Sequence, residues 1–382
     1  MNLADMLSYA DIQQLARIAR QYDCECNSHS KHDLIQSILS AVGSRDIFEH
    51  QVNTMSLEEL RFLNSLLFDE RAAFSLEELI SRVQQTRFDS QAADNKEAAN
   101  PRDTIVKFKH SGWLFNGCSQ QTKYLFQVPD DLKRRFRDVL HKRFQHQLVH
   151  VHEPEAYRDE DGRLGEDLIE LLRFVHTGVV PLNNESVMYK KTQQQLLDSF
   201  AVKEAVVQKG EWRFGYGRRF HDYPNRMSLI YDYAFYQGWL EEMEGHLRLT
   251  ATGQERFING GGYEPIQPIY RFWLKLYKNA VPNLLSIVHW VNLCSARWST
   301  IESLESILQP YLKPFYYDTP QSIFRERIIR MMVYLGLLRY GEHSQLGPLV
   351  QVTKRGQTLI QGVYVDHDDK IPLIVDKQQR HC

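Results

Sequence analysis

Residues 336–360 have the sequence GLLRYGEHSQLGPLVQVTKRGQTLI, and this stretch decides the predicted fold. An amphipathic segment, 322–335, leads into Gly336, and an apolar strand, 349–353, leads into a second glycine, Gly356. Glycine ends a helix readily because it adopts the left-handed conformation without strain. A two-stranded hairpin of this size must pack on helices to be stable. The stretch therefore predicts a helix ending at glycine, a short β-hairpin and a further helix.

A second copy of this pattern lies in the middle of the chain. The amphipathic segment 227–237 precedes Gly238-Trp239-Leu240, the strand 247–250, and Gly253 within a helix that runs to Ile258. Both copies end in the same Thr-x-x-Gly-Gln phrase. This shared ending favours a common fold over coincidence.

A third, earlier stretch has part of the same pattern. Gly112-Trp113-Leu114 is followed by the apolar strand 124–128 and by Pro129, which opens a basic helix. A helix that ends at glycine, a hairpin and a new helix are the third helix and wing of a winged helix–turn–helix unit. The predicted fold is therefore mainly α with small β-hairpins (α+β), with such units in tandem. The alternative is an unrelated α+β domain whose helices end in glycine.

The N-terminal residues 1–43 predict a helix–loop–helix module, with Ser8 as the cap of the first helix. The phrases at 15–20 and 30–39 resemble the SAP and Rho N-terminal helical modules, which usually touch nucleic acid.

Two further helices, 56–68 and 75–85, each begin with a serine three residues before a glutamate, the capping-box signature. The polar stretch 90–101 predicts a loop. Residues 153–170 are strongly acidic and predict a solvated linker followed by the helix 166–176. The predicted division is a SAP/Rho-N-like module (1–43), a winged-helix-like unit with a basic helix (45–150), an acidic linker and helix (151–182), a second winged-helix unit (183–260), a third (263–362) and a tail (363–382).

The composition is that of an ordinary globular protein. Of the 382 residues, 43% are hydrophobic and 25% are charged, which excludes a mostly disordered or fibrous chain. No apolar run approaches the ~18 residues of a membrane span, and the N-terminus lacks the pattern of a signal peptide. Five cysteines, an odd number, argue against a disulfide framework. These features predict a soluble, cytoplasmic protein.

The net charge of −2 means that any contact with nucleic acid must come from local basic patches. Residues 101–150 hold ten Lys or Arg against four Asp or Glu, and 209–226 alternates basic with aromatic residues. Arginines on the third helix of the last unit, beside a basic wing end, suit a surface that enters a DNA groove. The solvated face of any helix carries similar charges. The candidate DNA-binding residues are Arg325, Arg327, Arg330, Lys354, Arg355, Arg213, Arg218, Arg219, Lys133, Arg134 and Arg135.

Other motifs do not support catalysis or cofactor binding. Cys24, Cys26, His29 and His32 are possible metal ligands, but the pairs are too close for a usual zinc site, which favours a polar loop. The 215–219 loop lacks the Lys-Ser/Thr of a phosphate-binding P-loop. His367-Asp368-Asp369, in the tail, does not indicate a cation site. Cys118 and Cys294 have no base nearby in the sequence and so do not indicate a nucleophile. We therefore predict no cofactor, no metal, no small-molecule substrate and no enzymatic activity.

The phrase 187–197, VMYKKTQQQLL, together with the tandem winged-helix pattern and a basic hairpin, resembles bacterial helicase-associated proteins. In that group a non-enzymatic chain accompanies an XPB-type DNA-repair helicase. The resemblance spans roughly residues 45–362 and rests on architecture and short phrases. The helicase motifs themselves, a G-K-[ST] loop and a D-E-x-[HD] box, are absent from this sequence. The resemblance therefore implies an accessory factor and not the motor.

The expected function is that of a DNA-binding accessory factor in a helicase, repair or replication complex. Its expected partners are duplex or junction DNA and a helicase or other repair or replication protein, without a membrane. The third-helix arginines would approach a groove, Lys354 and Arg355 would hold adjacent phosphates, and the segment 212–223 would stack on unpaired bases. The main alternative is a winged-helix protein–protein adaptor that does not bind nucleic acid. An unrecognised enzyme and a ligand-responsive transcription regulator are further alternatives.

Overall fold

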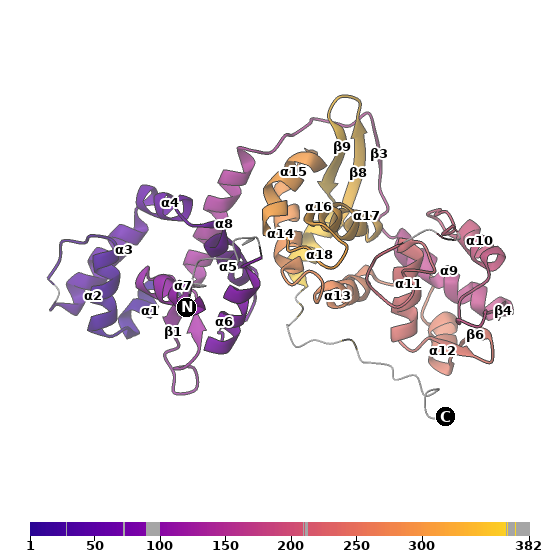
Figure 1. The fold of residues 1–382 in the computed structure, drawn as a ribbon, viewed down its shortest axis with the longest axis horizontal. Coiled ribbons are helices and arrows are strands. Elements are labelled where there is room, and N and C mark those ends of the chain that lie inside the picture. The colour runs from indigo at the N-terminus through magenta and orange to yellow at the C-terminus, as the bar shows by residue number, and fades with distance from the viewer. Residues whose placement is uncertain are drawn as a thin grey trace. The chain divides into compact units, whose positions relative to one another are not determined.

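The computed structural model describes residues 1–27, 29–71, 73–88, 100–208, 210, 213–363, 365 and 371. The chain divides into two compact units, Met1–Gln147 and Leu148–Cys382, and each is described by itself (Figure 1).

Helices dominate the N-terminal unit. Its elements are α1 (Leu3–Tyr9), α2 (Ile12–Gln21), α3 (Lys31–Gly43), α4 (Arg45–Asn53), α5 (Leu57–Leu67), α6 (Leu76–Gln85), α7 (Pro101–His110), β1 (Phe115–Asn116), β2 (Phe126–Gln127) and α8 (Asp130–Gln145). Buried aromatic rings link these helices. Trp113 packs edge-on against Phe108 and Phe136, with ring centroids 5.4 and 5.3 Å apart. Edge-to-face packing of this kind adds stability beyond the area that it buries.

Local capping signals fix several of these helices. The capping boxes predicted at Ser56 and Ser75 are both confirmed, since each serine oxygen accepts the N–H of the glutamate three residues on. The prediction for residues 1–43 is corrected, because three helices form there. The cap of α2 is Asp11, whose carboxylate accepts the Gln14 N–H at 2.7 Å, whereas Ser8 lies inside α1. A carboxylate is an equally good cap, and the sequence did not separate the two positions.

The C-terminal unit combines helices with two small sheets. Its elements are β3 (Ala156–Arg158), α9 (Arg163–Thr177), β4 (Val180–Pro181), α10 (Lys190–Ser199), α11 (Asn225–Tyr236), β5 (Leu240–Met243), β6 (His246–Leu249), α12 (Ala251–Asn259), α13 (Ile266–Tyr277), α14 (Leu284–Cys294), β7 (Ser299–Thr300), α15 (Ile301–Leu308), η1 (Gln309–Tyr311), α16 (Pro320–Ser322), η2 (Ile323–Ile329), α17 (Arg330–Tyr334), β8 (Leu338–His343), β9 (Gly347–Val352) and α18 (Lys354–Gly362). α16, η2 and α17 run on as one helix, which we call the arginine helix (320–334). The fold class is α+β.

One order of elements recurs three times within the described residues. It is helix, strand, helix, helix, two-stranded hairpin and closing helix, and the first strand always pairs with the second hairpin strand. The copies are α9–β4–α10–α11–β5–β6–α12, then α14–β7–α15–arginine helix–β8–β9–α18, and in the N-terminal unit α5–α6–α7–β1–β2–α8. In that last copy the first strand is a single bridge between Phe74 and Phe126.

The repeated glycines and threonines of the sequence hold each hairpin to its helices. Gly336 has the predicted left-handed conformation, with φ of 68°. Thr353 then caps α18, accepting the Gly356 N–H at 2.8 Å, and its hydroxyl donates to the Gly336 carbonyl at 3.0 Å. Thr250 makes the same contacts in the preceding copy, to Gly253 and Gly238. The Thr-x-x-Gly phrase is therefore a clasp that closes the β5–β6 and β8–β9 hairpins of the C-terminal unit.

The acidic stretch 153–170 is largely solvent-exposed before its helix, as its charge predicts, but part of it also forms a strand, which was not predicted. Residues 156–158 form β3, which pairs antiparallel with β8 and so covers the edge of the sheet. Figure 1 shows β3 running beside the β8–β9 hairpin. Glu160, two residues after this strand, is buried, at 4% exposure. Helix α9 begins at Arg163, earlier than predicted, after Gly162 in a left-handed conformation.

Candidate nucleic-acid interface

The arginine helix is positioned by a capping residue and by its apolar face. The Thr319 hydroxyl oxygen accepts the Ser322 N–H at 3.1 Å at the start of the helix. Phe324 and Ile328 are fully buried, which fixes the rotation of the helix about its axis. Its middle part, Ile323–Ile329, is wound as a π-helix, a form that is frequent at functional sites.

An open hollow of about 560 Å³ lies between the arginine helix and the strands β3 and β8. We call it the hairpin groove. Arg325 and Arg330 line it from the helix, and Arg158 lines it from β3. Tyr157 and Tyr340 line it from the strands, and Tyr157 is 61% exposed. The groove thus combines three guanidinium groups and two aromatic rings, the side chains that contact phosphates and bases in nucleic-acid complexes, with two carboxylates, Glu326 and Glu342.

The two arginines of the helix are each paired with a carboxylate. Arg325 donates to Glu305 and Arg330 donates to Glu326, one turn earlier on the same helix. Their side chains are 40% and 46% exposed. The Arg330–Glu326 pair is half-exposed on both sides and such pairs contribute only about 0–1 kcal/mol, whereas Glu305, the partner of Arg325, is buried. An incoming phosphate can therefore compete with Glu326 for Arg330 at little cost.

Arg158 contacts an aromatic ring as well as a carboxylate. Its guanidinium lies 5.3 Å from the centroid of the Tyr340 ring and its Nε lies 3.4 Å from Glu160. Burial raises the pKa of Glu160, although Arg158 and Arg226 lower it. The stacking on tyrosine holds the planar guanidinium at the wall of the groove.

Arg327 does not lie on the exposed face expected for a DNA contact. Its Nε donates to Asp318 at 2.9 Å, its guanidinium also donates to the Phe214 carbonyl, and the side chain is only 11% exposed. Arg327 therefore ties the loop before α11 to the arginine helix.

Arg218 and Arg219 share one buried carboxylate, Glu242. Arg219 donates to both of its oxygens, at 2.9 and 2.8 Å, and Arg218 does so in parallel. The Tyr231 hydroxyl donates to it as well, at 2.6 Å. Burial opposes the ionisation of Glu242, but these hydrogen bonds outweigh burial and hold its pKa below the ordinary value. The two arginines are thus parts of an internal network.

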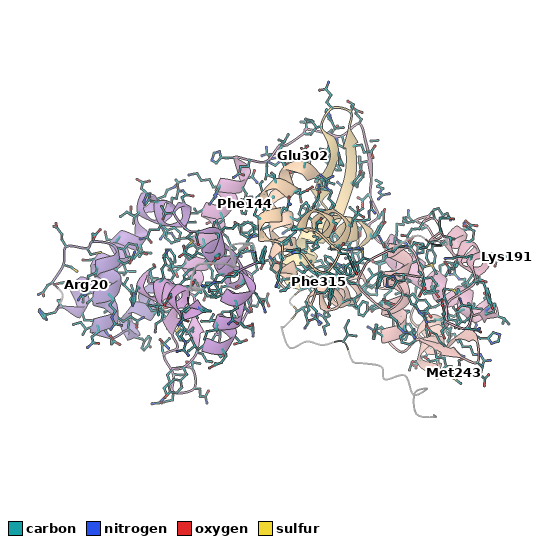
Figure 2. All side chains as sticks on the ribbon, viewed as in Figure 1. Arg20, Phe144, Lys191, Met243, Glu302 and Phe315 are labelled. Atoms are coloured by element: carbon teal, nitrogen blue, oxygen red, sulfur yellow. The ribbon has the colours of Figure 1, made fainter. Side chains whose placement is uncertain are left out.

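Tyr216 and Tyr223, in the 212–223 segment, pack inward and are not displayed for base stacking. Tyr223 is fully buried. The Tyr216 ring lies 4.8 Å from Tyr277 and 5.7 Å from Phe315, which Figure 2 labels, and its hydroxyl binds Asp318. The expectation of stacking is corrected for these rings, because packing on neighbouring helices buries more apolar surface than exposure would. Trp212 and Lys209 lie outside the described residues, as does His367-Asp368-Asp369.

The three candidate basic residues of α8 differ in how far they are exposed to bind DNA. Lys133 donates to the Asp69 carbonyl at 3.2 Å, and burial lowers its pKa. Arg135 donates to the Val42 carbonyl at 2.5 Å. Arg134 alone of the three is exposed.

Lys354 and Arg355 lie in the first turn of α18, directly after the hairpin. Arg355 donates to Asp161 at 2.9 Å and to the Tyr263 hydroxyl at 2.6 Å. Lys354 is exposed and has no carboxylate partner in the part of the chain that the structure describes. Lys354 is therefore more available than Arg355 to bind a phosphate.

Sequence reasoning missed Tyr157, Arg158 and Tyr340, which make up one wall of the hairpin groove. Tyr157 and Arg158 stand within the acidic stretch, whose charge indicated a linker and not a strand. Only the pairing of β3 with β8, across more than 180 residues of sequence, places them beside the arginine helix. No sequence pattern near residues 156–158 predicts that pairing.

Among the described residues, no three His, Cys, Asp or Glu side chains are grouped so that they could hold a metal ion. Within the same residues, no helix has both the length and the apolar character that crossing a membrane requires. Comparison of the chain with models of protein families, with curated proteins and with solved structures found no match. We therefore infer function from the geometry of the hairpin groove.

Proposed function

We propose that the three recurring sets of elements are winged helix–turn–helix units. In a helix–turn–helix protein the second helix of the pair enters the major groove of DNA. In the last copy, α15 and the arginine helix would be that pair, and the β8–β9 hairpin would be the wing. The common strand order of the copies supports this interpretation.

We propose further that the chain is a non-enzymatic DNA-binding accessory factor. The observation that carries this proposal is the hairpin groove, where Arg158, Arg325 and Arg330 gather beside two tyrosines. A duplex backbone along the groove would meet these guanidinium groups, which bind phosphate in bidentate fashion. Lys354, at the base of the hairpin, would add a further phosphate contact.

The resemblance to helicase-associated chains extends the proposal to a partner. We propose that the chain acts in the cytoplasm beside a helicase or another repair or replication protein. Tandem units suit this role because one unit can hold DNA while another contacts the partner. The energy for movement along DNA would come from that partner.

Fluorescence polarisation with labelled duplex, forked and single-stranded DNA tests the proposal at several salt concentrations. Each phosphate contact contributes about 0.9 to the slope of log affinity against log salt on duplex DNA. Replacing Arg330 by glutamine should therefore flatten the slope by about 1, and the Arg158→Gln, Arg325→Gln, Arg330→Gln triple variant by up to about 3.

Arg173→Gln is the matched control. Arg173 is 53% exposed and pairs with Glu170 on the same helix, as Arg330 pairs with Glu326. It does not line the groove. Thermal unfolding shows whether each variant is folded, which matters because Arg325→Gln leaves the buried Glu305 unpaired. A folded Arg330→Gln protein with the slope of the wild type would contradict the proposal.

A second candidate function, a protein–protein adaptor, is favoured by the pairing of the groove arginines with carboxylates. Because these carboxylates neutralise the arginines, the surface suits a protein partner better than it suits DNA, which is a polyanion. If this is the function, the wild type binds none of the three DNAs at low salt. Partner proteins that co-purify with the wild type would then be lost from Tyr157→Ala, which removes the exposed ring of the groove.

A further inference from the structure

A second hollow, of about 500 Å³, adjoins the hairpin groove at Glu326 and Arg330, which line both. We call it the basic hollow. Its other walls are the chain after α10, the loop at 213–214, the start of α11 and the last turn of the arginine helix. It is lined by four cationic side chains, Lys203, Arg213, Arg327 and Arg330, against two carboxylates, Glu204 and Glu326.

Among the described residues Arg213 makes no ion pair with a carboxylate, although the charge of nearby Glu204 partly offsets its own. Its guanidinium donates to the side-chain oxygen of Asn225, a neutral amide. Asn225 stands at the first position of α11 and is itself part of the wall. One hydrogen bond occupies part of the guanidinium fork, whose remaining donors are free to bind an oxyanion.

Lys203 and Arg327 hold fixed positions around Arg213. The Lys203 ammonium donates to the Phe200 carbonyl at 2.6 Å and to the Asp198 carbonyl, at the end of α10. Because carbonyl groups are neutral, they do not cancel the positive charge of Lys203, and its third N–H can still donate to a ligand. Arg327 is anchored by Asp318, which is not part of the wall.

Glu204 hydrogen-bonds to backbone groups, and Arg213 acts on it only through its charge. Its two oxygens accept the Arg226 and Met227 N–H groups, at 3.0 and 2.9 Å, in the first turn of α11. The positive end of the helix therefore balances this carboxylate. Burial raises the pKa of Glu204, against the lowering effect of those backbone bonds. The second carboxylate, Glu326, is held by a half-exposed pair with Arg330.

We propose that the basic hollow binds a terminal phosphate group, a phosphomonoester carried by a nucleotide or by the end of a DNA strand. Arg213 and Arg330 grip its oxygens, and Lys203 adds a point charge. Phe214 and Tyr334, also in the wall, provide apolar surface for the attached sugar or base. The volume is in the range of small-molecule sites. This site shares Arg330 and Glu326 with the hairpin groove, but Arg213 and Lys203 line only the basic hollow, so their variants test it apart from the DNA backbone contact.

Isothermal titration calorimetry of the full chain tests the site. The probes are inorganic phosphate, adenosine, adenosine 5′-monophosphate, and one oligonucleotide with either a 5′-phosphate or a 5′-hydroxyl. Binding of the monophosphate but not of adenosine supports a nucleotide ligand. Tighter binding of the 5′-phosphorylated strand than of its 5′-hydroxyl form, without binding of the monophosphate, supports a strand end.

The variants give the sharper comparison. Arg213→Gln should weaken the binding at least tenfold, since glutamine can still hydrogen-bond Asn225 but carries no charge. Arg213→Lys should restore part of it. Glu326→Gln should strengthen binding several-fold because it releases Arg330, and Arg173→Gln should change nothing.

Three results overturn the proposal. The first is that no phosphate-bearing probe binds to the folded wild type, and the second is that adenosine binds as tightly as its monophosphate. The third is that a folded Arg213→Gln protein binds like the wild type. The DNA proposal is tested separately with Arg158→Gln and Arg325→Gln, because these residues line the hairpin groove and not the basic hollow.

Discussion

Replacing Gly356 with alanine tests the clasp that closes the last hairpin. A Cβ atom at this position would lie 2.3 Å from the Leu337 carbonyl oxygen and 2.8 Å from the Leu337 Cα. Both are backbone atoms, held by the Thr353 N–H bond to the same carbonyl at 2.9 Å. Forcing an extra carbon into a packed site costs about 1–3 kcal/mol, and the better helix propensity of alanine returns at most ~1 kcal/mol.

The expected net destabilisation of Gly356→Ala is about 1–2 kcal/mol, a fall in Tm of about 2–8 °C for a unit of this size. Differential scanning calorimetry of the full chain measures it. Gly362→Ala is the matched control, because Gly362 ends the same helix and its added Cβ would meet no atom within 4 Å. A Gly356→Ala protein as stable as the control would refute the close approach of α18 to the hairpin, and with it the clasp.

Two further predictions concern buried carboxylates of the C-terminal unit. Burial raises the pKa of Asp232 to about 7, so the folded state holds a proton that the unfolded chain releases at lower pH, and stability falls as pH rises from about 4 to 7. Asp232→Asn, which keeps an oxygen for the Arg218 N–H, should flatten this decline in urea unfolding at pH 5 and 8; an unchanged decline would contradict the assignment. Glu242→Gln should cost about 3–5 kcal/mol because it leaves two guanidinium groups without their carboxylate. The control Glu244→Gln removes an exposed pair with Arg248 and should change the free energy of unfolding by less than ~1 kcal/mol. Equal losses for the two variants would show that the Glu242 network does not support the fold.

Sequence alone was informative wherever the physical cause is local. The capping boxes at Ser56 and Ser75 depend on residues three apart, and the left-handed Gly112, Gly238 and Gly336 depend on a helix that must end. Such features follow from backbone geometry within a few residues.

The partners of charged residues could not be predicted in this way. Arg218 meets Glu242 across 24 residues and Arg355 meets Asp161 across 194. A basic cluster in the sequence therefore says little about which charges remain available. Of the basic residues predicted to bind DNA, Arg327 and Arg219 are largely buried in ion pairs, at 11% and 9% side-chain exposure.

β3 shows the same limit for the fold. Ala156, Tyr157 and Arg158 are all exposed and lie between acidic residues, so they lack the alternation of a half-buried strand. They form a strand only because β8 offers them an unpaired edge. That edge depends on the folding of a hairpin far along the chain.

Amide hydrogen exchange of the full chain, with and without a duplex oligonucleotide, tests the role of the hairpin groove most directly. If DNA lies in the groove, the duplex should slow exchange in residues 156–158, 325–333 and 338–343, and leave α10 unchanged. Equal exchange in these three segments with and without bound duplex, or protection confined to other helices, would contradict it.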